Sequence, residues 1–365
     1  MEFVSPIFDL YTDYLLVNPG QTTATGLESL LAGKIKHDSI TRALSEKDYP
    51  SRELWLAVKP FVRQVESEDG VLILDDSVEE KLYMEENAII CWHRDHCQNR
   101  TVKGINQLTA LYYSEQTSLP VGYEIIDKTQ VVQDKKTGKD KRISTVSKQE
   151  RFRRLIKQSI TNGLLFEYIL ADSWFSSAEN MNFIHQQKRQ FILPLKSNRK
   201  VALSLEDKLE GKYQPIESLP LEKNELLPVY LEAVDFPLLL TKQVFQNKDE
   251  SEGILYLVTD DSTADAQKIQ TIYAKRWKVE EFYKSIKSNT GYAKSPAHRV
   301  RTQSNHLFLS MLAFVKLEAL KLSTKMNHFA LKSLLTLNAL KTAWKHLQVL
   351  KANTNLLNSH SLLVH

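Results

Sequence analysis

Five side chains suited to holding metal ions and phosphate groups lie close together between residues 273 and 287. At about 100° per residue, Tyr273, Arg276, Glu280 and Lys287 fall within a narrow arc of one helix, and Lys284 joins them. A carboxylate can bind a divalent metal ion, whereas arginine, lysine and tyrosine can bind phosphate oxygens. The stripe is therefore typical of a phosphoryl-transfer site. An exposed helix with i,i+4 ion pairs is the alternative interpretation.

The segment that carries this stripe must be helical to bring the side chains together. A separate apolar stripe repeats at helical spacing and consists of Val279, Phe282 and Ile286. We predict a single helix that begins near Ser262, with Asp265 in its cap, and that packs through the apolar stripe. Such a helix would present Glu280 between cations on another side.

Two further carboxylates follow short apolar runs that are typical of strands buried on both faces. Residues 71–74 precede Asp75, and residues 168–171 precede Asp172. Two strand ends that face one helix can bring three carboxylates together, as two-metal phosphoryl transfer requires. Either aspartate taken singly could instead be a helix cap or a turn residue. We call Asp75, Asp172 and Glu280 the acidic triad.

The spacing of these residues resembles the YREK signature of DDE transposases of the "insertion sequence four" family, which move DNA by cut and paste. Tyr, two residues, Arg, three residues, Glu, six residues and Lys occur here without a gap, with Trp277, Glu281 and Phe282 in the family's usual positions. The family's first motif, a hydrophobic strand followed by Asp, any residue and Ser or Thr, matches residues 74–77. Its second motif, an Asp followed closely by an aromatic residue, matches residues 172–175.

The resemblance implies an α/β protein with an RNase H-like catalytic core, a β-rich insertion, and helical N-terminal and C-terminal regions. It also implies that the acidic triad binds two Mg²⁺ ions, with Mn²⁺ able to substitute, for DNA cleavage and strand transfer. The first motif assigns Asp75 as the ligand. Asp76 is the alternative, because the pleat of a strand turns adjacent side chains to opposite faces.

The expected partners are double-stranded DNA, both as the terminal inverted repeats of a mobile element and as the target, and a second copy of the chain in a homodimeric synaptic complex. The residues expected to contact DNA are Tyr273, Arg276, Lys284, Lys287, Lys139, Lys141 and Arg142. The last three belong to a basic run at residues 135–157, where clustered charge indicates a polyanion-binding surface or a merely solvated face.

Some relatives form a DNA hairpin during excision, with an aromatic residue of the insertion against a flipped base. Residues 197–265 contain no tryptophan, which leaves Tyr230, Phe236 or Phe245 as substitutes and puts this step in question.

A chain of 365 residues is long for one domain. We predict a helical DNA-binding region at 1–66, the first part of the core at 67–196, the β-rich insertion at 197–265, the acidic helix and the next helix at 266–320, and a basic helical region at 321–365. The first region would hold a helix-turn-helix or a plain helical hairpin. Predicted strands occupy residues 71–74, 104–113, 119–126, 168–171, 190–195, 227–234, 238–245 and 253–258, with helices at 148–160 and 176–187.

Other chemistries have weaker support in the sequence. Residues 91–97 read C-W-H-R-D-H-C, which matches no tetrahedral zinc spacing, so we predict a polar corner near the active face. No phosphate-cradling G-x-x-x-x-G-K loop is recognisable, so ATP use is unsupported. No signal peptide or membrane span is recognisable, which predicts a cytoplasmic protein, and the family resemblance implies a bacterial, nucleoid-associated one. Two rival functions are an inactive DNA-binding protein derived from a transposase and a nuclease that hydrolyses without strand transfer.

Overall fold

The computed structural model describes residues 5–95, 100–135, 138–246 and 250–361. Four helices come first: α1 (Pro6–Val17), α2 (Ala24–Leu30), α3 (His37–Ser45) and α4 (Ser51–Val65). Helix α3 begins at His37, after Lys36, which makes no side-chain cap bond. Within the described ranges, no helix is long and apolar enough to cross a membrane.

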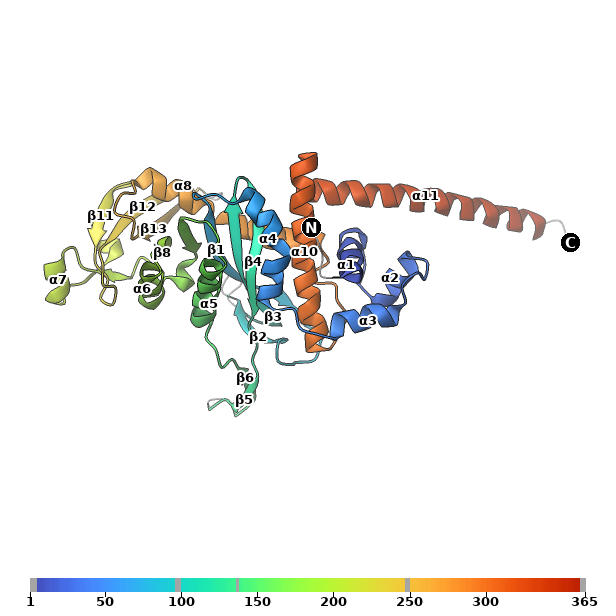
Figure 1. Ribbon diagram of the computed structural model, residues 1–365, viewed down its shortest axis with the longest axis horizontal. Coiled ribbons are helices and arrows are strands. Elements are labelled where there is room, and N and C mark those ends of the chain that lie inside the picture. The colour runs from blue at the N-terminus through green and yellow to red at the C-terminus, as the bar shows by residue number, and fades with distance from the viewer. Residues whose placement is uncertain (1–4, 96–99, 136–137, 247–249, 362–365) are drawn as a thin grey trace.

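A nine-stranded mixed sheet forms the centre of the molecule (Figure 1). In spatial order its strands are β11 (Leu226–Val229), β12 (Leu238–Gln246), β13 (Glu252–Thr259), β8 (Gln190–Leu195), β7 (Tyr168–Ala171), β1 (Val71–Glu80), β3 (Arg100–Ser114) and β2 (Cys91–Asp95). Strand β4 (Thr117–Ile125) pairs with β3 on the same edge as β2. The resulting order β4-β3-β1-β7-β8 has three antiparallel strands followed by two parallel ones, which is consistent with the expected RNase H-like core.

The strand predictions for the middle of the sheet are confirmed. Strands β7 and β8 occupy exactly the predicted residues, because their continuous apolar runs are buried on both faces. Strand β1 is longer than predicted and continues to Glu80, since β3 pairs with it as far as Gly104. No pattern predicted β2, which is a short edge strand.

The insertion continues the core sheet. Strand β13 pairs antiparallel with β8, and β12 and β11 follow outward from it. One hydrogen-bonded ladder therefore joins the insertion to the strand that follows Asp172. The remaining elements of the insertion are β9 (Lys200–Val201), α7 (Leu205–Leu209), β10 (Gln214–Pro215) and η2 (Ile216–Ser218).

Helices cover both faces of the sheet. Side chains of α4, α5 (Lys148–Thr161) and α6 (Ala178–Gln186) lie on one face, where Gly122 of β4 approaches both Leu155 and Ser51. Helices α9 (Trp277–Asn289) and α10 (Val300–Thr324) lie on the other face, where Met311 contacts Gln107. Helix α11 (His328–Ser361) leaves the body, and its residues from 333 to 352 are exposed (Figure 1).

The prediction of a single helix for residues 262–287 is wrong. The structure has α8 (Ala266–Ala274), capped by Asp265, and then a separate α9. Between them the chain tightens, because the amide of Arg276 donates to Tyr273 and that of Val279 donates to Arg276, both with i→i+3 spacing. Residues that share an arc on an ideal helix therefore point in different directions here.

Candidate active site

Strand register places the two aspartates of the acidic triad beside each other. Leu74 and Ala171 are partners in the parallel pairing of β1 with β7, so Asp75 and Asp172 are the next residues on each strand. Asp172 also caps η1 (Ser173–Phe175), where its Oδ1 accepts a hydrogen bond of 3.0 Å from the amide of Trp174. The cap interpretation of Asp172 is therefore correct, and the cap fixes the carboxylate at the end of β7.

Asp75 and Asp76 face opposite sides of the sheet. The Asp75 carboxylate lies 3.7 Å from Arg276, just before α9, whereas Asp76 forms an ion pair of 2.7 Å with Lys148 of α5. This division follows from the pleat of β1. The backbone at this point is held by Tyr283, whose hydroxyl donates to the Asp75 carbonyl at 2.8 Å.

Arg276 connects two members of the acidic triad. Its Nη1 atom lies 3.7 Å from Asp75 Oδ2 and 3.4 Å from Glu280 Oε1. The Glu280 side chain is 42% exposed, whereas that of Asp75 is 15% exposed. In the described part of the chain, no three acidic, histidine or cysteine side chains come close enough to hold one metal ion. The guanidinium is thus the cation between Asp75 and Glu280 in this structure.

Negative charge accumulates at the end of β1. Burial, followed by the nearby carboxylates of Asp172, Asp76 and Glu280, raises the pKa of Asp75 to about 8, and Arg276 offsets only part of this. Burial and the charge of Asp76 also raise the pKa of Asp172. Buried carboxylates that repel one another form an environment that favours a bound cation.

The other residues of the predicted stripe, Tyr273, Lys284 and Lys287, do not all lie beside the carboxylates of the acidic triad. Tyr273 is buried, and its hydroxyl donates to the Ala171 carbonyl at 3.4 Å, which ties α8 to the end of β7. Lys287 donates to the Val78 carbonyl at 2.9 Å, farther along β1. Lys284 lies 5.4 Å above the Phe329 ring, toward α11.

The three predicted DNA contacts of the basic run lie on a separate hairpin. Strands β5 (Gln130–Gln133) and β6 (Asp140–Ile143) project from the body in Figure 1. Lys141 pairs with Asp134 at 2.8 Å, and Arg142 lies 3.7 Å from Glu86. Lys139 joins the two strands through its carbonyl, which accepts from the Asp134 amide. The structure does not bring these residues to the acidic triad.

Sequence reasoning missed two residues that shape the site. Lys148 was assigned only to a general basic run, although its position at the start of α5 brings it to Asp76. Tyr283 follows the recognised Glu281 and Phe282, but nothing in its type indicated that it would hold the Asp75 backbone. The nearby Cys91 and His93 are buried in β2, and burial lowers the pKa of His93 to about 3. His96 and Cys97 lie outside the described residues.

The aromatic residues considered for a flipped base are differently placed. Phe236 stacks on His185, with ring centroids 3.8 Å apart. Phe245 is half-exposed, and Tyr230 lies where the chain bridges to Ala202. Trp174, outside the predicted insertion, is 47% exposed and directly follows Ser173 at the end of β7.

One known protein family matches more than half of the chain. Residues 92–315 match the family described as "Transposase DDE domain". The matched range includes Asp172 and Glu280, and it begins after Asp75. No curated protein matches the chain. Since the match spans more than half of the sequence, the chain belongs to the family of transposase DDE domains.

Proposed function

We propose that this protein is a transposase of the "insertion sequence four" family, YREK group, that cuts the ends of a mobile DNA element and joins them to target DNA. The observation that supports this most is the approach of Asp75, Asp172 and Glu280 from two neighbouring strands and a helix, with Arg276 among them. Their order along the chain and their positions on strand ends and helix fit a DDE transposase domain.

The donor set fits Mg²⁺ or Mn²⁺. Carboxylate oxygens are the ligands that these ions prefer, and the raised pKa values of Asp75 and Asp172 reflect burial first and then nearby negative charge that one guanidinium does not neutralise. Glu280 is partly exposed, and it would turn from Arg276 toward the aspartates to share a metal ion with them. Two bound ions would activate the attacking oxygen and stabilise the charge that develops on the phosphate.

The chain's own residues would hold the DNA in position. Arg276 borders a cavity of about 770 Å³ that Asp172 and Tyr273 also line, so its guanidinium can bind a phosphate in a fork once it leaves Glu280. We assign Lys284 and Lys287 to phosphates farther along α9. Lys139, Lys141 and Arg142 would contact flanking DNA only by exchanging their present contacts. We also assign DNA binding to residues 1–66 and a homodimer to the synaptic complex.

The test is a reaction of the wild-type protein and Glu280→Gln with labelled DNA that carries the inverted repeats flanking the gene. We expect the wild type, with Mg²⁺ or Mn²⁺, to give nicked, excised and joined products. The Glu280→Gln variant should bind end DNA with an affinity within a few-fold of the wild type. It should cut no DNA, because it loses the charge that holds the metal. Nicking without joining would favour the nuclease, and binding without any cleavage would favour an inactive DNA-binding protein.

A further inference from the structure

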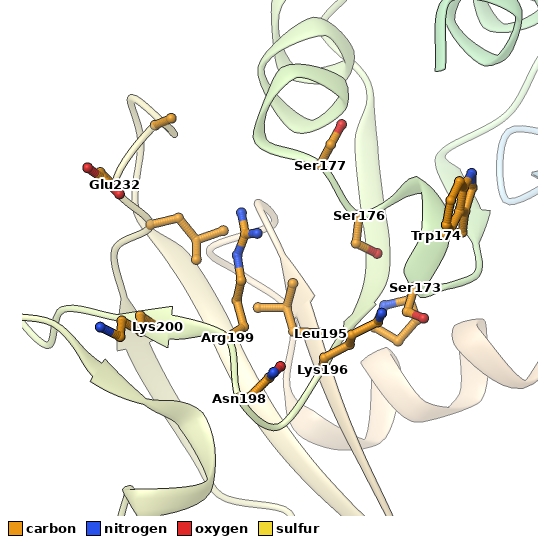
Figure 2. Close-up of a pocket in the computed structure, with 13 residues that line it drawn as sticks. Ser173, Trp174, Ser176, Ser177, Leu195, Lys196, Asn198, Arg199, Lys200 and Glu232 are labelled. Atoms are coloured by element: carbon orange, nitrogen blue, oxygen red, sulfur yellow. The ribbon is translucent and has the colours of Figure 1, made fainter. Parts of the chain in front are cut away.

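A second cleft lies beside the acidic triad, between η1, the start of α6 and the insertion (Figure 2). Its volume is about 580 Å³, within the range of about 300–1,000 Å³ that suits small ligands. Polar side chains dominate the lining, among them Ser173, Ser176, Ser177, Lys196, Arg199 and Lys200. A space of this size admits one or two nucleotides of a single strand, but it does not admit a duplex.

The cations of this cleft come from one loop, residues 196–200, which we call the cation loop. Lys196, Arg199 and Lys200 are exposed, and their side chains form no ion pair with any carboxylate of the described residues. Figure 2 shows the Arg199 side chain extending through the middle of the cleft, with Glu232 across from Trp174. Unpaired cations beside three serine hydroxyls form a site for an anion that carries several oxygens, such as a phosphodiester.

The cleft adjoins the cavity that Asp172 and Arg276 line. Both are lined by Ser173, Pro194, Leu195 and Lys196. Asp172, but neither Asp75 nor Glu280, lines that cavity together with Arg276, whereas Arg199 and Lys200 line the cleft. A DNA strand whose phosphate lies at Asp172 can therefore pass Ser173 and Lys196 directly into the cleft.

Trp174 lies at the rim of the cleft, and two hydrogen bonds hold its backbone. Its amide donates to Asp172, and its carbonyl accepts a hydrogen bond of 2.9 Å from Gln149. The ring is 47% exposed, and Lys148 lies 5.9 Å from its centroid. An aromatic face beside a cationic groove is the usual arrangement for binding single-stranded nucleic acid, because every base has a face that can stack.

We propose that this cleft binds one or two unpaired nucleotides of the DNA strand that extends from the acidic triad. Lys196, Arg199 and Lys200 would hold the phosphates, and Trp174 would stack against a base. The inference rests on the proposed function for the identity of the ligand as DNA. It adds that the protein distinguishes an unpaired strand from a duplex through a surface outside the YREK residues.

The experiment compares two fluorescent probes of the same sequence, a blunt duplex and a duplex with a four-nucleotide single-stranded tail. Arg199→Ala combined with Lys200→Ala should weaken binding of the tailed probe roughly tenfold and flatten its salt slope by roughly 1.4, while the blunt duplex changes less than twofold. Trp174→Ala should weaken binding of the tailed probe by a further factor of roughly five to ten, and Trp174→Phe should retain most of the lost affinity.

The matched control is Lys157→Ala combined with Lys223→Ala, which removes two exposed charges that lie outside the cleft and have no carboxylate partner among the described residues. We expect this control to change the affinity for both probes equally and by less than twofold. Thermal melting confirms that each variant is folded. Equal losses on the tailed and blunt probes, or no loss in the Arg199 and Lys200 variant, would overturn the proposal. A wild type that prefers the tail but never cuts DNA would overturn the proposed function and leave this inference standing.

Discussion

The basic run and the cation loop contain the same residue types but differ in what those residues already touch. In the basic run, Lys141 pairs with Asp134, Lys148 with Asp76, and Arg151 with Glu124. In the cation loop, the side chains of Lys196, Arg199 and Lys200 have no carboxylate partner among the described residues. Among the described residues, a larger share of the cations is therefore paired in the longer cluster than in the shorter one. The pairing of cations, rather than their number along the sequence, determines where a polyanion can bind.

The largest effect is expected for two adjacent acidic residues, Asp75 and Asp76. Asp76 forms an ion pair with Lys148 of the basic run, whereas Asp75 pairs with no residue of that run. Asp75→Asn should lower the rate of DNA cleavage in Mg²⁺ by roughly 10³-fold or more, because several kcal/mol of metal-dependent stabilisation is lost. Asp76→Asn should lower the rate by about tenfold at most, since its carboxylate is held by Lys148 on the other face. The measurement is the single-turnover rate with labelled end DNA. If the two results are reversed, Asp76 is the ligand and the strand register does not determine the site.

A second test asks whether a paired cation of the basic run contributes to the free energy of unfolding. The Arg151 side chain is 8% exposed and bonds to Glu124 at 3.0 Å and to the Ile125 carbonyl at 3.0 Å. Arg151→Ala should lower the free energy of unfolding by about 3 kcal/mol, because it leaves a mostly buried carboxylate unpaired. DNA affinity of the folded fraction should stay within twofold.

The control for that test is Arg154→Ala on the same helix. Arg154 pairs with Glu150, and about half of each side chain is exposed. Its loss should cost less than about 0.5 kcal/mol in chemical denaturation. Comparable destabilisation by both variants would show that burial does not separate the two arginines, and a large loss of DNA affinity in Arg151→Ala would show that pairing does not remove a cation from DNA binding.

The smallest expected effect concerns the β5–β6 hairpin. The combined change of Lys139, Lys141 and Arg142 to Ala should flatten the dependence of log affinity on log salt by less than about 1, whereas three free duplex contacts would give roughly 2.7. The reason is that Lys141 and Arg142 already have carboxylates nearby. The measurement is a salt titration of binding to blunt duplex. A change near the larger value would mean that DNA readily displaces these ion pairs.

Sequence reasoning succeeded where a pattern is local. The apolar runs of β7 and β8 and the polar residues that follow them are local, and the predicted strands coincide with the observed ones. The prediction of one continuous helix across Arg276 failed because a tightened turn depends on tertiary contacts, including the hydrogen bond of Tyr273 to Ala171. The partners of Lys148 and Tyr283 lie 72 and 208 residues away, which no local pattern records. The acidic triad was named from spacing and family resemblance, and its catalytic role is still a prediction.

The way the acidic triad is assembled has a consequence for the growing chain. Asp75 and Asp172 meet only when β1 pairs with β7, and Glu280 joins them only when α9 packs on β1. At about 5–20 residues per second, a ribosome adds the stretch from Asp172 to Glu280 in roughly 5–20 s. During that interval the nascent chain has both strands but lacks the helix that brings Glu280 and Arg276. The carboxylates therefore come together only late in translation, after the insertion has been made.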